Sequence, residues 1–547
     1  MRSSPAVRTA GWLAGLTAAL WMTAAGTAGA GTIAATSASS PSSPSSPASP
    51  GSSPDPGSWT VYHGDLAGRG VAASAGVVET TSRAWTSPAL DGELYGEPLV
   101  SAGRVYVATE NDTVYALSAA TGKVAWSRHL ATAVPASSLP CGDIHPTVGI
   151  TGTPVIDPAR DEIFLVADEE AHGRPAHVLA GLSTATGKVE MTRDVDPAGA
   201  DTAALLQRTG LTLAGGRVVF GFGGNDGDCE PYRGRVVSVP ETGGVPSIFT
   251  VDAKAGESQG AVWMGGAAPA VDAAGDVWVS VGNGSVYKAS RGYDDSDSVL
   301  ELSPTMRLLQ YFAPASWPSD NEHDRDFSAE PALLPGGQVL IAGKSRIAYL
   351  LNGAHLGGIS GQLASLGPLC TADIDGGPAV TGRTVYLPCL AGPVAVRVTA
   401  SPAGLRQVWS SQHGGGSPIV AGGLVWTISQ GGTLYGLDPG TGQVRQQAGI
   451  GTPANHFPTP GAGAGLLLAP ATNRVVAFRV GAAGSSPAST TPASTHPSAA
   501  VTSRALPGSS PPSAGLSGGA IAGIVIGSLA VLSVIGWLVW RRVPNRS

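Results

Sequence analysis

The chain has 547 residues, a formal net charge of −7 and only 13% charged residues. No cluster of Lys and Arg could neutralise a run of phosphates, so the composition argues against nucleic acid as a partner. The length exceeds that of a usual single hydrophobic core, which directs attention to internal repeats.

The first 57 residues read as export and linker sequence. Residues 1–30 combine Arg2 and Arg8, an apolar run and the small-residue pattern Ala28-Gly29-Ala30, which together predict a secretory signal peptide. A retained anchor is the alternative, but the apolar run is short for a full span. Residues 31–57 are rich in Ser, Pro and Ala and predict a disordered linker.

The C-terminal end predicts a membrane anchor. Residues 481–517 form a second Pro-, Ser- and Thr-rich stretch, which we interpret as a disordered stalk. Residues 518–540 carry no charge and are long enough to cross a bilayer; a buried core helix is the alternative. The following tail, 541–547, contains three Arg residues and is predicted to be cytoplasmic. We therefore expect a single-pass cell-membrane protein with its folded part outside the cell.

Four cysteines are present. In an exported protein, a small even number of cysteines favours disulfides over metal thiolates. Three pairings are possible, and we favour Cys141–Cys229 with Cys370–Cys389 because the second pair is close in sequence.

A repeat begins in the stretch from residue 103 to residue 126. Two β-rich runs, 105–107 and 114–117, are separated by a polar turn, and a Gly-bearing turn then leads into a run that ends on Trp126. The unit recurs at roughly fifty-residue spacing, which is typical of four-stranded propeller blades. The second strands of the eight units begin at Val105, Ile163, Val218, Val277, Val339, Thr384, Val425 and Leu466.

The eighth unit ends near Val480, before a fourth strand. Residues 82–86, which contain Trp85, resemble a fourth strand without a blade and could close a ring by pairing near Phe478. We therefore predict an all-β, eight-bladed β-propeller of four-stranded blades over residues 58–480, with an open β-solenoid as the alternative. The tryptophans that recur at the fourth strand are predicted to pack between blades: Trp85, Trp126 and Trp409.

Repeats of the form VYVAT…VYALSAATGKVAW resemble the quinoprotein dehydrogenase-like family of β-propellers, also called PQQ-like repeats. The resemblance covers about residues 58–480. It implies one of two functions, because the family contains enzymes that use pyrroloquinoline quinone (PQQ) with calcium and also cofactor-free scaffold proteins.

For the enzyme function, the resemblance implies Asp326 as the catalytic base and Asn283 as a calcium ligand. Glu170 lies nearest to the expected cofactor-binding Glu, although the alignment there is off by one residue. The four cysteines are too far apart for the adjacent disulfide of the enzymes, and small residues fill the quinone-stacking position unless Trp263 takes it. Asn283 also reads as a turn residue before Gly284, and Asp326 as a capping residue.

No other pattern indicates a metal or catalytic site. The acidic loops 225–228 and 294–297 lack the length and closing Glu of an EF-hand, and the histidines show no metal-ligand spacing. We therefore predict a monomeric, non-catalytic binding or scaffold module for a protein or cell-envelope partner, without a cofactor. The alternative is a divergent alcohol or sugar dehydrogenase dependent on PQQ and calcium.

Overall fold

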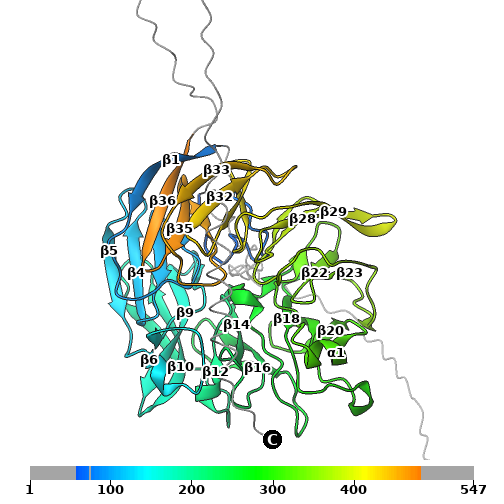
Figure 1. The fold of residues 1–547 in the computed structure, drawn as a ribbon. Helices are drawn as coiled ribbons and strands as arrows, with labels where there is room; N and C mark the ends of the chain where they lie inside the picture. The colour runs from blue at the N-terminus through cyan, green and yellow to red at the C-terminus, as the bar shows by residue number, and fades with distance from the viewer. Residues whose placement is uncertain (1–56, 73–75, 482–547) are drawn as a thin grey trace, which may run out of the picture. The chain divides into compact units, whose positions relative to one another are not determined.

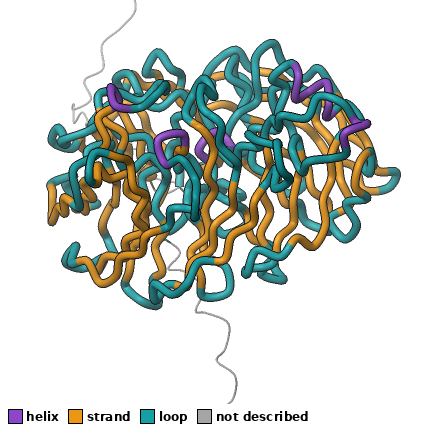
Figure 2. The backbone as a smooth tube through the Cα atoms, turned by 90° about the horizontal axis from the view of Figure 1, so that it is seen from below, coloured by secondary structure: helices purple, strands orange, loops and turns teal. Residues whose placement is uncertain are grey.

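The computed structural model describes residues 57–72 and 76–481, which form eight antiparallel sheets arranged in a ring (Figure 1). The predicted eight-bladed, all-β propeller is confirmed. The strands run across the thickness of the ring and the connecting loops gather at its two faces (Figure 2).

The predicted signal peptide and stalk lie outside the described residues, as does the span 518–540. Within the described part of the chain, no helix is both long and apolar enough to cross a membrane.

Blades 1 to 4 follow one another along the chain, and each runs from an inner strand outward. The strands of blades 1 and 2 are β2 (Leu99–Ser101), β3 (Arg104–Ala108), β4 (Thr113–Ser118), β5 (Val124–His129), β8 (Val155–Asp157), β9 (Glu162–Ala171), β10 (Arg174–Ser183) and β11 (Val189–Asp194). Those of blades 3 and 4 are β12 (Leu205–Leu206), β13 (Thr212–Leu213), β14 (Arg217–Gly224), β15 (Arg235–Pro240), β16 (Ser247–Thr250), β17 (Ala270–Val271), β18 (Val277–Val281), β19 (Ser298–Leu302) and β20 (Leu308–Ala313).

Blades 5 to 8 repeat this order. The strands of blades 5 and 6 are β21 (Ala332–Leu333), β22 (Gln338–Ile341), β23 (Ala348–Asn352), β25 (Ala364–Leu366), β26 (Ala379–Thr381), β27 (Thr384–Leu387), β28 (Val394–Ala400) and β29 (Ala403–Ser410). Those of blades 7 and 8 are β30 (Ile419–Ala421), β31 (Leu424–Ile428), β32 (Thr433–Leu437), β33 (Val444–Gly449), β34 (Gly461–Gly463), β35 (Leu466–Ala471), β36 (Arg474–Gly481) and β1 (Val77–Thr86).

A few short elements lie in the connections between and within the blades. They are the ribbon of β6 (Val134–Pro135) and β7 (Thr147–Val148), the strand β24 (Gly358–Ile359) beside β20, the helix α1 (Trp317–Glu322), and 3₁₀ turns at Ala136–Ser138, Thr202–Ala204, Met264–Gly266 and Ala289–Arg291.

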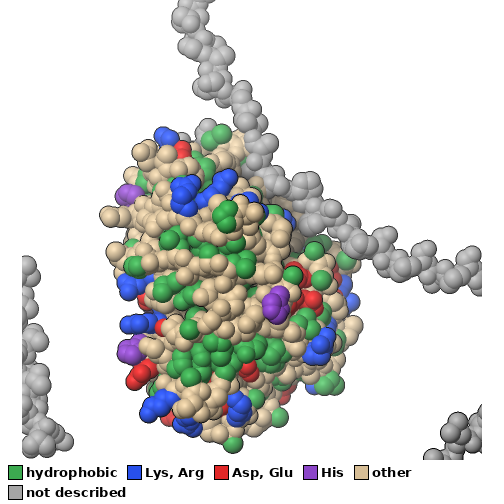
Figure 3. Space-filling model, turned by 90° about the vertical axis from the view of Figure 1, so that its right-hand side faces the viewer, with side chains coloured by type: hydrophobic (Ala, Val, Ile, Leu, Met, Phe, Trp, Pro, Cys, Tyr) green, Lys and Arg blue, Asp and Glu red, His purple; other side chains and the backbone are tan. Residues whose placement is uncertain are grey.

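Burial differs between the inner and outer strands of a blade. The strands nearer the axis are buried on both faces because the sheets stack against one another, as in β18, the second strand of blade 4, where all five residues are buried. Fourth strands such as β11 and β33 alternate between exposed and half-buried residues. The outer surface is therefore mixed in character, and on the side drawn in Figure 3 Lys and Arg are interspersed with uncharged side chains rather than gathered into a basic patch.

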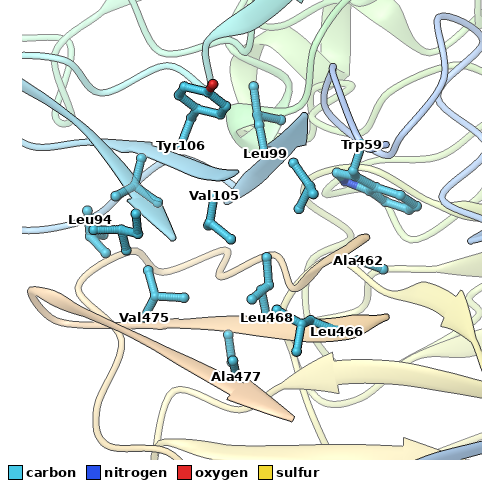
Figure 4. Packing of buried hydrophobic residues seen from close by; sticks show 14 of the residues in the cluster. Trp59, Leu94, Leu99, Val105, Tyr106, Ala462, Leu466, Leu468, Val475 and Ala477 are labelled. Carbon is cyan, nitrogen blue, oxygen red and sulfur yellow. The ribbon is translucent and has the colours of Figure 1, made fainter. Parts of the chain in front are cut away.

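The ring closes through the N-terminal strand. β1 pairs antiparallel with β36, with Arg83 opposite Phe478 and Trp85 opposite Ala477, as the sequence analysis predicted. The closed sheet packs its inner strands against blade 1: Leu466 and Leu468 of β35 lie beside the cluster that contains Leu99 and Val105 (Figure 4).

Three tryptophans join neighbouring blades in the same way. Trp85 donates its Nε1–H to Ala119 O, Trp126 to Thr184 O, and Trp409 to Pro439 O, in each case in the next blade. Each indole also covers the glycine of that blade's turn between its third and fourth strands. At Gly122, Gly187 and Gly442 a Cβ atom would lie 2.4 to 2.6 Å from the ring. The predicted packing role of these tryptophans is confirmed.

This packing predicts that Gly187→Ala destabilises the protein by about 2–3 kcal/mol, measured by chemical denaturation of the full chain. Part of the cost is the left-handed backbone, with φ of +70°, and part is displacement of Trp126, whose ring carbon lies 2.6 Å from the new Cβ. Gly216→Ala is the matched control because Gly216 has φ of +72° and a Cβ there would have no atom of a non-neighbouring described residue within 4 Å. Equal losses in the two variants would contradict the packing role.

The N-terminal segment (residues 57–72) runs across one face of the ring. Its carbonyl groups accept backbone hydrogen bonds from inner strands around the ring: Thr60 O from Ile156, Leu66 O from Val271, Arg69 O from Val380 and Gly70 O from Val420. The side chain of Glu97 accepts Trp59 Nε1–H at 2.9 Å and His63 N–H at 2.7 Å. This segment therefore ties the inner strands of several blades together.

Candidate functional site

A cavity of about 280 Å³ lies on the axis of the ring, among the loops that lead into the inner strands and those that follow the second strands. We call it the axial pocket. Its lining residues come from most of the blades: Asp143, Leu206, Arg208, Gly224, Asn225, Asp226, Gly227, Asp228, Tyr232, Ala261, Trp263, Asn283, Asp324, Asp326, Lys344, Asp375, Leu390, Gln430, His456 and Phe457.

An ion-paired centre occupies one wall of the axial pocket. Lys344 Nζ lies 2.7 Å from Asp324 Oδ1 and 3.1 Å from Asp326 Oδ1. Asn283 donates its amide N–H to the same Asp324 oxygen at 2.7 Å. Its own Oδ1 has no hydrogen-bond partner in the described structure. The four side chains come from blade 4, blade 5 and the connection between these blades, so the packing of one blade against the next brings them together.

Aromatic rings border this centre. Trp263 donates its Nε1–H to Asp326 Oδ2 at 3.2 Å. Lys344 Nζ lies 5.4 Å from the centroid of the same indole ring, and the Phe457 ring lies 5.7 Å away on another side. The indole therefore contacts both members of the buried ion pair.

Two glycines make this packing possible. A Cβ at Gly282 would lie 2.6 Å from Asp326 Oδ2, so the carboxylate can approach the end of β18 only because no side chain is there. Gly265, just after Trp263, has φ of +58°, and a Cβ there would lie 2.4 Å from Gly376 N.

Arg208 lies in another wall of the axial pocket. Its guanidinium lies 5.4 Å from the Tyr95 ring centroid and 5.7 Å from that of Phe457. It also donates to Asn455 Oδ1 at 2.8 Å, and Asn455 donates in turn to Tyr95 O. The arginine is thus fixed between aromatic rings, without an ion pair to a carboxylate within salt-bridge distance among the described residues.

Burial shifts the titration of the pocket's charged groups. It raises the pKa of Asp375 to about 7, and it raises the pKa of Asp326 although Lys344 opposes that shift. Burial also acts to lower the pKa of Lys344, but the carboxylates of Asp326 and Asp324 outweigh it and the net shift is upward. Lys344 is therefore a permanent cation in this site.

Both disulfides lie next to pocket residues. Cys141–Cys229 and Cys370–Cys389 are formed, which are the two pairs that the sequence analysis favoured. Cys229 follows the lining residue Asp228, and Cys389 precedes the lining residue Leu390. The cross-links therefore fix loops at the mouth of the axial pocket.

The structure brings together some of the residues singled out from the sequence and separates others. Asn283, Asp326 and Trp263 all line the axial pocket. Glu170 does not: it lies near the tip of the long β9–β10 hairpin, exposed, where Oε1 accepts the backbone N–H of Gly173 at 3.0 Å. It contributes nothing to the pocket.

Five charged lining residues had no role in the sequence analysis: Asp143, Arg208, Asp324, Lys344 and Asp375. Lys344 is a lone basic residue just after an apolar second strand, and a charge at that position of a blade is a usable signal for an axis-facing side chain. Asp324 precedes Asp326 by two residues, so the spacing Asp-x-Asp could have drawn attention to it. No local pattern marks Arg208 or Asp375.

The residues present do not fit a resident calcium ion. Calcium takes six to eight oxygen ligands, whereas the ammonium of Lys344 already lies between Asp324 and Asp326. Among the described residues, three metal-ligating side chains converge closely at one place, Asp272, Asp276 and Glu301, which is outside the axial pocket. The oxygens of Asp272 there already accept N–H groups from Ala274, Asp276 and Trp278.

Comparison with known proteins supports the fold. A family model described as outer membrane protein assembly factor BamB matches residues 71–295. The comparison with curated protein sequences found no match.

Solved structures of the same architecture cover most of the chain. The quinohemoprotein alcohol dehydrogenase of Pseudomonas putida HK5 has a TM-score of 0.58 at 13% identity, covering 79% of this chain and 81% of its own. That of Comamonas testosteroni has a TM-score of 0.58 at 15% identity, covering 78% and 80%. A europium-containing methanol dehydrogenase has a TM-score of 0.56 at 13% identity, covering 78% and 98%. At such identities the likeness shows the fold alone, and the resemblance to PQQ-like propellers is confirmed at that level.

Proposed function

We propose that this PQQ-like propeller acts by binding rather than by catalysis, and that the axial pocket is its binding site. The observation that carries the proposal is the contact of the Lys344 ammonium with both Asp324 and Asp326. The chain's own cation neutralises Asp326, the carboxylate that the resemblance to the enzymes implies as the catalytic base. A cavity with polar groups gathered beside aromatic rings is the form that ligand sites take.

The rim of the pocket supports a binding role. Binding residues concentrate on loops that a rigid frame holds in place. Here the frame is the closed ring, and the disulfides Cys141–Cys229 and Cys370–Cys389 fix two pairs of rim loops. The family model that matches residues 71–295 is described for an assembly factor rather than an enzyme, which agrees with this role.

The proposed setting is the cell surface. A signal peptide at 1–30 would export the chain, and a single span at 518–540 would hold it in the cell membrane with a cytoplasmic tail. The stalk 481–517 would then display the propeller away from the bilayer as a monomer. A protein or another cell-envelope component is the proposed partner.

The second candidate function is a quinone-dependent alcohol or sugar dehydrogenase. One observation favours it: Asn283, Asp326 and Trp263, singled out from the resemblance to such enzymes, share the axial pocket. The absence of Glu170 from that pocket and the position of Lys344 argue against it.

Cofactor loading tests the enzyme function directly. Full-length protein in detergent is mixed with PQQ and either CaCl₂ or EuCl₃, and bound quinone absorbance and dye-linked alcohol or sugar oxidation are measured. We expect no stoichiometric complex at micromolar PQQ and no oxidation, because the donors for the metal are not gathered. A stoichiometric, active complex would establish the dehydrogenase and overturn the non-catalytic proposal.

Site-directed photo-crosslinking tests the binding function. A photoactivatable residue is placed at Gln430 on the pocket rim or, as a matched control, at Ala274 in the turn between β17 and β18, and each variant is irradiated in cells. We expect an adduct from Gln430 and none from Ala274. Adducts of equal yield at both positions, or from Ala274 alone, would refute the axial pocket as the binding site.

A further inference from the structure

The axial pocket carries an excess of negative charge. Six aspartates line it, against one arginine and one lysine. Asp324 and Asp326 already share the ammonium of Lys344, and Asp143 Oδ2 lies 3.4 Å from the ring nitrogen Nδ1 of His456. The other three aspartates are Asp226, Asp228 and Asp375, and none of them has an ion pair within salt-bridge distance in the described structure.

The pocket already shows how it holds an ammonium group. Lys344 Nζ contacts two carboxylates and lies 5.4 Å from the face of the Trp263 indole. Carboxylates combined with an aromatic face form the usual recognition site for an organic cation. Lys344 therefore shows that the side chains of this pocket can stabilise a buried ammonium group.

Unused acceptors remain in the wall of the pocket. Asp375 is 3% exposed, and its Oδ1 accepts no hydrogen bond from any residue that the structure describes. Asn283 Oδ1 is likewise buried without a partner. A buried carboxylate oxygen without a donor is costly, so a donor supplied from outside would be bound favourably.

Other ligand classes fit these features less well. A polycarboxylate such as PQQ would meet the excess of aspartates, and a neutral polyol would leave that excess uncompensated. A divalent cation needs its oxygens gathered on one point, whereas among the described residues no three Asp or His side chains of the pocket converge in that way. A primary ammonium carries three separate donors and one charge.

We propose that the axial pocket binds a ligand through a primary ammonium group, which is held by Asp375 and the Trp263 side of the cavity. This inference rests on the proposed binding function and specifies its ligand class. The ammonium could belong to a free small amine or to a lysine side chain that a protein partner inserts into the pocket.

The proposal predicts a distinctive pH dependence. Burial sets the pKa of Asp375 to about 7, with Asp326, Asp373 and Lys344 as the charged neighbours that act on it. A bound ammonium favours the ionised carboxylate, so affinity rises as pH increases through 7. Between pH 6 and pH 8 the ionised fraction of Asp375 grows roughly tenfold, and affinity should follow it. The amine itself stays protonated over this range.

Calorimetric titration of the full-length protein tests the proposal. The probes are 1,5-diaminopentane for a free amine and Nα-acetyl-lysine amide for a lysine side chain, with 1,5-pentanediol as the uncharged analogue. We expect binding of at least one amine and none of the diol, and tighter binding of the lysine derivative would identify a protein partner as the source. Binding of the diol as tightly as the diamine, or no binding of either amine at millimolar concentration, would overturn the proposal.

Variants locate the site. Asp375→Asn should weaken amine binding about tenfold or more and abolish its rise between pH 6 and pH 8. Trp263→Leu should weaken it about five- to tenfold. Glu190→Gln, on the exposed outer strand β11, is the control and should change nothing. An unchanged amine affinity and an unchanged pH profile in a folded Asp375→Asn variant would also overturn the proposal. In that case a photo-crosslinked adduct at Gln430 would still support the binding function itself.

Discussion

Lys344→Met is expected to cost about 3–5 kcal/mol of folding free energy at neutral pH. The substitution keeps the length of the side chain but leaves Asp326, whose side chain is 4% exposed, as an uncompensated buried charge. Asp324 is 67% exposed and can be solvated, so the penalty falls mainly on Asp326. Urea denaturation of the full-length protein measures the loss.

The sign of the pH dependence follows from Asp326. Its pKa is raised in the folded protein by burial, and removing Lys344 raises it further. A carboxyl whose folded pKa lies above its unfolded pKa destabilises the protein fully above the folded pKa, and this loss diminishes as pH falls from the folded towards the unfolded pKa. The loss caused by Lys344→Met should therefore shrink as pH falls from 7 towards 5.

A double variant provides the control. Lys344→Met with Asp326→Asn removes both charges and should recover most of the stability, because a buried pair replaced as a whole costs much less than one broken on one side. No recovery in the double variant, or a loss independent of pH, would show that the lysine acts through packing alone.

Trp85→Ala is expected to cost about 3–5 kcal/mol, as is usual for truncation of a buried tryptophan. It removes the bond from Nε1 to Ala119 O and the packing over Gly122. Trp409→Ala is the matched control. Both tryptophans are 8% exposed, and both bond the next blade in the same way.

Only the Trp85 substitution affects the closure of the ring. Hydrogen exchange measured by mass spectrometry should therefore show loss of protection in β1 and β36 for Trp85→Ala, and in β29 and its neighbours for Trp409→Ala. Protection lost equally around the ring in both variants would mean that the blades unfold together and that closure has no separate weak point.

The fold could be predicted from the sequence because its information is local and repeated. Each blade carries its own alternation of apolar residues and its own turns. The eighth unit lacks a fourth strand, and residues 82–86, which precede the first unit, have the pattern of that missing strand. The pairing of Arg83 with Phe478 follows from counting strands, without any long-range information.

The candidate site could be predicted only in part because it depends on how loops of different blades meet at the axis of the ring. Asn283 and Asp326 were found through a resemblance. The position of Lys344 after an apolar strand marks it as a candidate axis-facing residue, but its ion-pair partners lie on another loop and no local pattern identifies them. The prediction that Glu170 lies in the site did not account for the length of the β9–β10 hairpin. β9 and β10 each extend for ten residues, which carries Glu170 away from the axis to the hairpin tip.

The position of β36 has a mechanical consequence. Although it is the last strand of the ring in sequence, it lies between β35 and β1, so hydrogen bonds hold it on both sides. A pulling force applied at Gly481 would act on two ladders at once instead of peeling a single edge strand. The propeller is therefore built to resist load at the end from which the proposed tether departs, and closure by the N-terminal strand provides that resistance.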